Sequence, residues 1–326
     1  MKSFLIKSSI LSIVILTLHF GLAQLADGYS DPYYIKVASP KQTSLIVGAS
    51  RANVGIMPSI LDSVFNAHHL KTNFFNYAFA NTVSPYGNAY YKAIVEKIDK
   101  KNKTGMFILS VLPMTISSLP NNPNDVENFR ENKLALANIS HFNGRPNYDY
   151  LLNGYEYGWG NIILKKIENN MFNYLQKNKK IKKGVWTYVH KDGWFEMKYF
   201  FSDSAFFKKR TEQEIEKLIN SKTNKYKFSE VRYNYLAKTI NYLKNYGNVY
   251  IVRMPVHQKI IEYENKQMPN FDSLMHQLAK ENNVSYLNFT TLPQKYLYRD
   301  GNHFRKVSAI KFSINLANKI LNHLKR

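Results

Sequence analysis

The sequence predicts an α/β protein with a five-stranded parallel sheet covered by helices. Five short apolar runs are typical of strands in such a sheet, and helical stretches separate them along the chain. Strands that are joined through helices imply right-handed crossovers and a parallel order. The chain has 326 residues, of which 44% are hydrophobic, so it can bury a large core.

The strands and helices follow one another in a regular order outside one long stretch. The first strand, 45–47, is closed by Gly48, and a helix is predicted at 53–65. Ser229 and Gly247 are start and stop signals for a later helix. The other predicted strands are 73–77, 105–113, 248–255 and 284–289, and the other regular helices are 86–100 and 230–246.

Residues 114–227 break this order and are predicted to form a helical, aromatic-rich insertion over the sheet. An amphipathic helix is expected at 163–176, and a short helix is expected to begin at Thr211, with Glu214 at capping-box spacing. The aromatic side chains of the insertion could stack on sugar rings, although packing in a local core is the commoner role. The residues considered for stacking are Tyr155, Tyr157, Trp159 and Trp194.

The first 26 residues are predicted to be an export signal or an N-terminal membrane anchor. They contain Lys2 and Lys7, no acidic residue, and an apolar run at 10–18 followed by small residues at 21–23. The apolar stretch of 18 residues at 8–25 is marginal for a permanent membrane span, so cleavage and retention both stay open. In either case the body, 27–326, is expected in the periplasm or cell envelope.

The composition excludes several kinds of chemistry. The absence of cysteine excludes disulfides, thiol catalysis and cysteine-ligated metals. His68 and His69 have no partner at metal-ligand spacing, and no phosphate-binding glycine loop is present, so no metal or cofactor is expected. The formal charge of +22 comes mostly from scattered lysines, without a nucleic-acid motif, so a nucleic-acid partner is not expected. The oligomeric state is left open.

Ser50 follows the first predicted strand, in the turn that leads into a helix, and is a candidate nucleophile. Such a serine could also simply cap the helix. Near the other end of the chain, Asp300 and His303 are three residues apart, with Gly301 allowing a tight turn. A serine hydroxyl needs a base to take its proton, and a carboxylate can fix the tautomer of that base. The three residues together therefore favour nucleophilic catalysis over a cap.

These motifs resemble those of the SGNH, or GDSL-like, hydrolases and O-acyltransferases, most closely the envelope-associated bacterial branch. The resemblance is carried by Gly48-Ala49-Ser50-Arg51, by Asn76, and by Asp300-Gly301-Asn302-His303-Phe304 before a final helix, and it excludes the insertion. It implies a flavodoxin-like three-layer sandwich. It also implies that Ser50 is the nucleophile, His303 the general base and then acid, and Asp300 the residue that orients His303.

The sequence departs from this family at the expected oxyanion hole. The family places an asparagine after the third strand, where this chain has "LSVLPMT", and the usual glycine after the second strand is missing. The backbone amides of Ser50 and Asn81 are expected to take over as donors. Losing one donor costs on the order of 3 kcal/mol of transition-state stabilisation, which leaves a slow or an inactive enzyme open. Arg51 and Arg253 could bind an anionic group near the site, or form surface ion pairs.

The expected function is that of an exported serine esterase or O-acyltransferase. Its expected substrate is a short acyl ester on an envelope or secreted polysaccharide, held through Trp159 and Trp194. An α/β-hydrolase elbow is excluded, because Ala52 stands where that motif needs glycine. The alternative is a non-catalytic envelope protein that keeps the fold and binds a glycan or another polymer.

Overall fold

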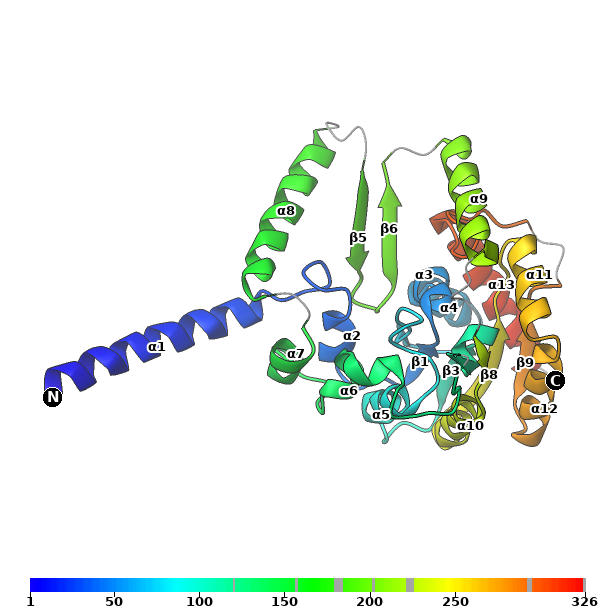
Figure 1. Ribbon diagram of the computed structural model, residues 1–326, viewed down its shortest axis with the longest axis horizontal. Helices are drawn as coiled ribbons and strands as arrows, with labels where there is room; N and C mark the ends of the chain where they lie inside the picture. Colours follow the sequence, from blue (N-terminus) through cyan, green and yellow to red (C-terminus); the bar gives the residue numbers. More distant parts are fainter. Residues whose placement is uncertain are drawn as a thin grey trace.

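A five-stranded parallel sheet in the order β2-β1-β3-β8-β9 forms the centre of the computed structural model (Figure 1). The structure describes residues 1–119, 121–155, 158–178, 184–200, 203–220, 226–291 and 295–324. The sheet strands are β1 (Ser44–Val47), β2 (Phe74–Asn76), β3 (Gly105–Ser110), β8 (Gly247–Arg253) and β9 (Ser285–Asn288). In sequence order this is the 2-1-3-4-5 arrangement of a flavodoxin-like sheet, so the predicted fold class is confirmed.

Both faces of the sheet are buried, which explains the continuous apolar runs of its strands. Leu45 and Val47 point to one cluster of core residues, whereas Ile46 points to another on the opposite face. Neighbouring strands are in register, with Ile46 of β1 opposite Ile108 of β3.

Helices cover both faces of the sheet and make three layers. On one face lie α3 (Ser50–Gly55), α4 (Pro58–Ala67) and α13 (Lys306–Leu324). On the other face lie α2 (Tyr34–Ala38), α5 (Asn88–Lys97), α10 (Glu230–Lys244) and α12 (Phe271–Glu281). Helix α11 (Gln258–Gln267) follows β8 and packs against α9 (Ser204–Asn220).

The single helix predicted at 53–65 is two helices in the structure. Pro58 is the first residue of α4, and Met57 before it is extended, as the residue before a proline usually is. The buried Asn76 side chain donates hydrogen bonds to the Ala52 and Ile56 carbonyls, at 2.9 Å each, and so satisfies the backbone at the break.

The chain between β3 and α10 contains short helices, one long hairpin and two longer helices. It starts with η1 (Pro113–Ile116) and β4 (Ser117–Ser118), and β4 pairs antiparallel with β7 (Lys227–Phe228) at its end. Between them lie η2 (Arg130–Lys133), α6 (Ala135–Asn138), α7 (Tyr148–Asn153), α8 (Gly160–Lys177), β5 (Val185–Val189), β6 (Phe195–Tyr199) and α9. Helix α8, the β5–β6 hairpin and α9 project from the same side of the body (Figure 1).

Two expectations for this stretch are wrong. The antiparallel β5–β6 hairpin stands where only irregular or helical structure was expected. Helix α9 begins at Ser204, so Thr211 lies inside it and does not cap its start. The residue that caps α9 is Asp203, whose side chain accepts a hydrogen bond from the Phe206 backbone N–H at 2.6 Å.

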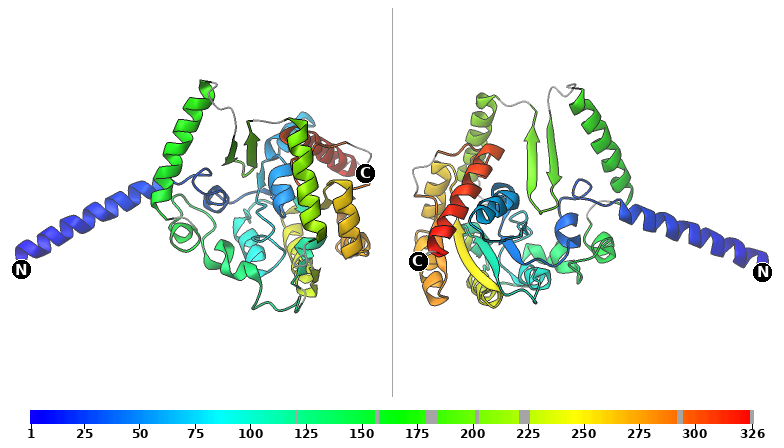
Figure 2. Two further views of the ribbon diagram at one scale, coloured as in Figure 1. Left: turned by 45° about the horizontal axis from the view of Figure 1, so that its top comes forward. Right: turned by 180° about the vertical axis from the view of Figure 1, so that it is seen from behind.

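Helix α1 (Lys2–Gln24) extends away from the rest of the molecule in every view (Figures 1 and 2). Of its residues only Ala23 is buried. By length and composition α1 could cross a membrane, and a signal sequence would pass the same test. The apolar segment predicted at the start of the chain is therefore present as one continuous helix.

Candidate active site

Ser50 is the first residue of α3 and lies directly beyond the carboxyl end of strand β1. The turn that places it requires Gly48, which has a φ of +145° and packs against Ser110. A Cβ on Gly48 would lie 2.8 Å from the Ser110 Cβ, so no larger residue fits there. The carboxyl edge of a parallel sheet is where α/β proteins usually bind ligands.

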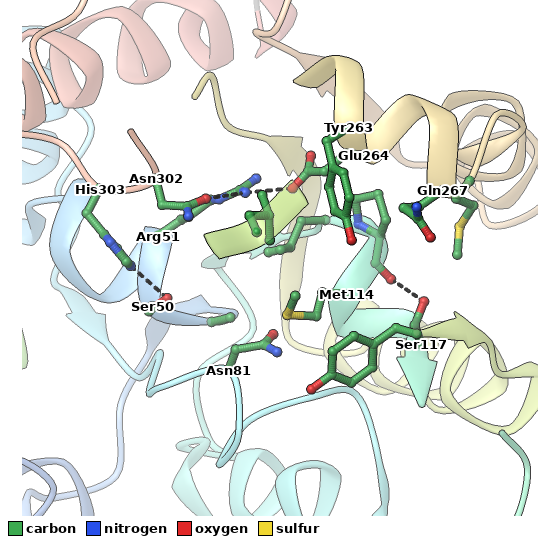
Figure 3. Close-up of a pocket in the computed structure, with 16 residues that line it drawn as sticks. Ser50, Arg51, Asn81, Met114, Ser117, Tyr263, Glu264, Gln267, Asn302 and His303 are labelled. Atoms are coloured by element: carbon green, nitrogen blue, oxygen red, sulfur yellow. Dashed lines mark hydrogen bonds and ion pairs between the residues drawn. The ribbon is translucent and has the colours of Figure 1, made fainter. Parts of the chain in front are cut away.

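Ser50, His303 and Asp300 lie in one hydrogen-bonded chain. The Ser50 Oγ is 2.9 Å from the His303 Nε2, a contact drawn in Figure 3. The His303 Nδ1 lies 2.9 and 3.0 Å from the two carboxylate oxygens of Asp300. When Nδ1 donates its proton to Asp300, Nε2 is free to accept the Ser50 hydroxyl proton. The arrangement has the geometry of a serine nucleophile with an oriented base.

Backbone and side-chain donors hold the Asp300 carboxylate in place. Its Oδ1 accepts hydrogen bonds from the backbone N–H groups of Asn302 at 3.1 Å and His303 at 2.8 Å. Arg299 Nε donates to its Oδ2 at 3.2 Å. Burial by itself would raise the pKa of Asp300, but the hydrogen bonds from His303 and the charge of Arg299 hold it well below its usual value. Asp300 is therefore ionised at neutral pH.

Burial keeps the imidazole of His303 neutral. Removal from water lowers the pKa of His303 below its usual value, and the positive charges of Arg299 and Arg51 lower it further. The hydrogen bond and charge of Asp300 act in the opposite direction without reversing the shift. His303 is consequently in its basic form at pH 7 and can accept a proton.

The backbone N–H groups of Ser50 and Asn81 make no hydrogen bonds with the described parts of the chain. Both residues line the same pocket, so the two amides predicted as oxyanion donors are brought to one place. The Asn81 side chain also faces the pocket in Figure 3, and its Oδ1 has no hydrogen-bond partner among the residues that the structure describes. After β3 the pocket wall is formed by Leu112, Pro113 and Met114, which supply no side-chain amide.

The pocket beside Ser50 has a volume of about 140 Å³ and mostly apolar walls (Figure 3). It lies between the carboxyl edge of the sheet, α11 and the end of the insertion, which contributes Leu218 and Tyr226. Its other apolar and aromatic side chains are Leu112, Pro113, Met114, Tyr263 and Met268. Such walls suit a hydrocarbon group placed next to the Ser50 hydroxyl.

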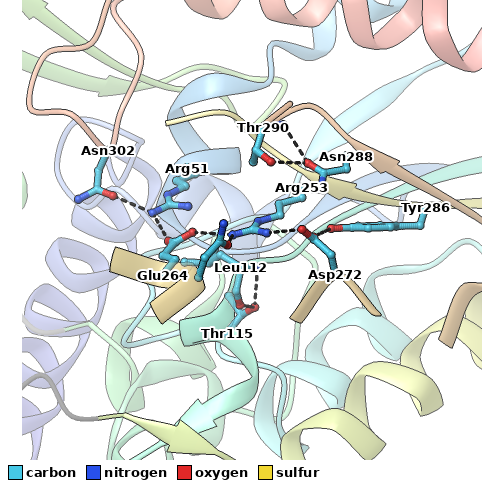
Figure 4. A network of polar contacts seen from close by, with 11 residues as sticks. Arg51, Leu112, Thr115, Arg253, Glu264, Asp272, Tyr286, Asn288, Thr290 and Asn302 are labelled. Atoms are coloured by element: carbon cyan, nitrogen blue, oxygen red, sulfur yellow. Dashed lines mark hydrogen bonds and ion pairs between the residues drawn. The ribbon is translucent and has the colours of Figure 1, made fainter. Parts of the chain in front are cut away.

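Arg51 and Arg253 belong to a buried ion-pair network (Figure 4). The Arg51 Nη2 donates to Glu264 at 2.6 Å and to the Asn302 side chain at 2.8 Å. Arg253 donates to Asp272 at 2.8 Å and also contacts Glu264 at 3.4 Å. The expectation of surface ion pairs is wrong, because the exposed fractions of the two arginines are 7% and 1%. Since both face carboxylates, neither offers an unpaired charge to an anion.

Glu264 and Asp272, the acidic partners in this network, were not predicted from the sequence. They lie 11 and 19 residues after Arg253 on two separate helices, α11 and α12. No local spacing marks such a pairing. A buried arginine at the end of a strand would indicate that a carboxylate lies nearby. The sequence does not show which arginines are buried, so this signal could not be used.

Asn76 lies outside the pocket and stabilises the helix that carries Ser50. Its side chain is buried, bonds the break between α3 and α4, and accepts a hydrogen bond from the Ala78 N–H. The Nζ of the buried Lys36 donates to the Asn76 and Ala78 carbonyls, at 2.7 Å each. Asn76 therefore holds α3, which carries Ser50, and cannot reach a substrate.

The structure corrects the sugar-stacking role of the two tryptophans. Trp194 is 4% exposed, and its indole N–H donates to the Val54 carbonyl at 2.9 Å, so neither ring face is open. Trp159 is half-buried with its ring 4.4 Å from His19 of α1, and it does not line the pocket. Tyr155 is half-buried in the core around α7. Tyr157 lies outside the described residues.

Comparisons with known proteins give little beyond the architecture. No family model matches the chain, and no curated protein matches it. One solved structure that it resembles is an aryl esterase from M. smegmatis in an inhibitor-bound form. The two are 10% identical with a TM-score of 0.37, and the match covers 86% of this chain and 99% of the other. At that TM-score the similarity says nothing about the activity of this chain.

Proposed function

We propose that this protein is a serine esterase or O-acyltransferase that forms an acyl-enzyme on Ser50. The observation that carries the proposal is the continuous contact from Ser50 Oγ to His303 Nε2 and from His303 Nδ1 to Asp300. A neutral His303 beside an ionised Asp300 is the protonation state that this chemistry needs.

The proposed reaction proceeds in two halves. His303 accepts the Ser50 proton while Oγ attacks the ester carbonyl carbon, and the negative charge on the carbonyl oxygen is met by the Ser50 and Asn81 amides. The tetrahedral intermediate then breaks its bond to the alcohol, which leaves with the proton from His303. In the second half, water or an acceptor hydroxyl gives its proton to His303 and attacks the acyl carbon, and His303 then returns the proton to Ser50 Oγ as the bond between Oγ and the acyl carbon breaks.

The oxyanion donors of this site suggest a slow or selective enzyme. Two backbone amides are available near Ser50, whereas no side-chain amide follows β3. One missing donor corresponds to on the order of 3 kcal/mol of transition-state stabilisation. A catalyst with this deficit depends more on how well it binds and positions its substrate.

The apolar pocket supports an acyl ester as the substrate. The acyl chain would lie between Met114, Leu218 and Met268, with its carbonyl at Ser50. We place the enzyme outside the cytoplasm because α1 has the character of an export signal or anchor. The proposed alcohol part of the ester is a hydroxyl of an envelope or secreted polysaccharide. The two tryptophans are no longer proposed to stack on its sugar rings.

Labelling with a fluorophosphonate tests the proposal directly, because the reagent reacts with an activated serine. The wild-type protein is expected to be labelled at Ser50 and to release nitrophenol from short acyl esters. The Ser50→Ala variant should lose both. Ser117→Ala is the matched control, since Ser117 lines the same pocket but donates to the Pro113 carbonyl and contacts no base. Equal turnover by wild type and Ser50→Ala would overturn the proposal.

A non-catalytic envelope protein that binds a polymer is the second candidate. The observation that favours it is the lack of a side-chain amide after β3. This candidate predicts that neither labelling nor ester turnover occurs while the folded protein retains an acylated glycan on an affinity matrix. Labelling of Ser50 at a rate well above that of free serine would exclude it.

A further inference from the structure

Helix α8 presents an apolar stripe to the outside of the molecule. Its members, Ile163, Leu164, Ile167 and Met171, have side chains that are 43, 60, 57 and 57% exposed. With 3.6 residues per turn, these four positions fall within about 100° of the helix circumference. A continuous exposed stripe of this kind differs from the single exposed apolar residues that are common on protein surfaces. We call these four residues the α8 stripe.

The inward face of α8 fixes the direction in which the stripe points. Ile162 is fully buried, and the ring of Phe172 stacks on Trp186 of the β5–β6 hairpin at 5.5 Å. Lys166 forms an ion pair with Asp27 at 2.9 Å. Because these contacts occupy the other side of the helix, the α8 stripe cannot turn into the core without breaking them.

The exposed apolar residues of α1 lie close to the start of α8. Trp159, which immediately precedes α8, packs its ring against His19 in the last turns of α1. A hollow between α1 and α7, next to the start of α8, is lined by Ile15, Leu16, Thr17, His19, Phe20, Tyr148, Leu152 and Trp159. Figure 1 shows α8 rising from the point where α1 joins the body.

A lipid bilayer fits this surface. Helix α1 has the length and apolar composition of a membrane span and almost no contact with the body. The chain also has a formal charge of +22, which complements anionic headgroups next to a bilayer. Trp159 stands where α1 meets the body, and tryptophan is enriched at membrane interfaces. We propose that the α8 stripe lies in the interfacial layer of the bilayer that α1 enters.

Single cysteine variants of the full-length chain test this proposal cleanly, because the natural sequence has no cysteine. Ile167→Cys carries a nitrobenzoxadiazole label in the stripe, and Asn173→Cys carries it on an exposed polar face of the same helix. Both proteins are reconstituted into vesicles of phosphatidylcholine and phosphatidylglycerol. Aqueous iodide and lipids with a nitroxide near the headgroup then serve as quenchers.

The label at position 167 should show blue-shifted emission, strong quenching by the nitroxide lipids and a several-fold lower iodide quenching constant than the label at 173. Equal iodide quenching at both positions would overturn the proposal. Protection of position 167 from both quenchers would overturn it too, because protein rather than lipid would then cover the stripe. In vesicles of phosphatidylcholine alone, the label at position 167 should be less protected from iodide. Unchanged protection there would show that attraction to anionic headgroups does not contribute.

Discussion

The charge of His303 should set the pH dependence of the proposed activity. Burial lowers the pKa of His303 below its usual value of 6.5, and only the neutral imidazole can accept the Ser50 proton. Activity should therefore be lost as the pH falls through a pKa below 6.5 and should be constant above it. The measurement is kcat/KM for a soluble nitrophenyl ester as a function of pH. An inflection above pH 7 would contradict the assignment of His303 as the base.

Asp300 should matter through the tautomer of His303 rather than through contact with the substrate. An Asp300→Asn variant keeps the size of the side chain but can donate to Nδ1, which would leave the proton on Nε2. Turnover should fall by about 10³- to 10⁴-fold, as expected when the orienting carboxylate is lost. Asp99→Asn, in the exposed turn before β3, is the control and should keep full activity. Similar rates for the two variants would argue against an orienting role.

At the level of single residues, the sequence predicted contacts that follow from local chemistry. The Asp300–His303 pair is bonded in the way its spacing suggested, and Ser50 lies within hydrogen-bond distance of His303. The surroundings of Arg51 and Trp194 were not predictable in the same way. Their partners lie 213 and 140 residues away, so their burial depends on the tertiary structure alone.

Among the elements, the β5–β6 hairpin is attached to the body partly through one carboxylate. Glu196 of β6 lies 2.8 Å from His190 and 2.7 Å from the ammonium of Lys306 at the start of α13. The His190 hydrogen bond and the Lys306 contacts outweigh burial and lower the pKa of Glu196 to about 2. Because the folded pKa lies below the unfolded value, this stabilisation is present above about pH 4.5 and disappears as the pH falls toward 2.

A Glu196→Gln variant should lower the free energy of unfolding by about 1–2 kcal/mol at pH 7, since both partners are partly exposed. Urea denaturation of wild type and variant at pH 7 and pH 3 measures the effect. The difference should shrink at pH 3, where the wild-type carboxylate loses much of its advantage. Glu168→Gln, which removes an exposed pair with Lys165, should change stability little. A difference that is independent of pH would point to packing instead of charge.

The regular elements of the sheet were predictable because their apolar runs are buried on both faces. Strands β2, β3 and β9 lie within the stretches that the sequence indicates, and β1 and β8 each begin one residue earlier, at Ser44 and Gly247. The β5–β6 hairpin had only one signal in the sequence, the apolar–polar alternation of the five residues Phe195–Tyr199, because Val185–Val189 has no such alternation. The break before α4 was signalled by Pro58, although the apolar pattern runs through it.

At the scale of the whole molecule, α1 is attached to the body by few contacts. Removal of residues 2–21 deletes the exposed part of the helix and keeps the buried Ala23. The contact that this removes is the ring packing of His19 against Trp159. The melting temperature, measured in the same detergent for both forms, should change by less than about 2 °C. A larger decrease would show that α1 is part of the folded core.

The position of His303 directly before α13 links the proposed catalysis to the docking of that helix. Ser50 and its base are 253 residues apart, and they meet only after α13 has packed against α3 and α4. The same docking event inserts Phe304 beside Gly55 and lets Ser313 accept the Met57 N–H. A nascent chain, or one still crossing a membrane unfolded, would carry a serine without a base. The nucleophile would thus be silent until α13 is in place, and recovered activity would report that α13 has docked.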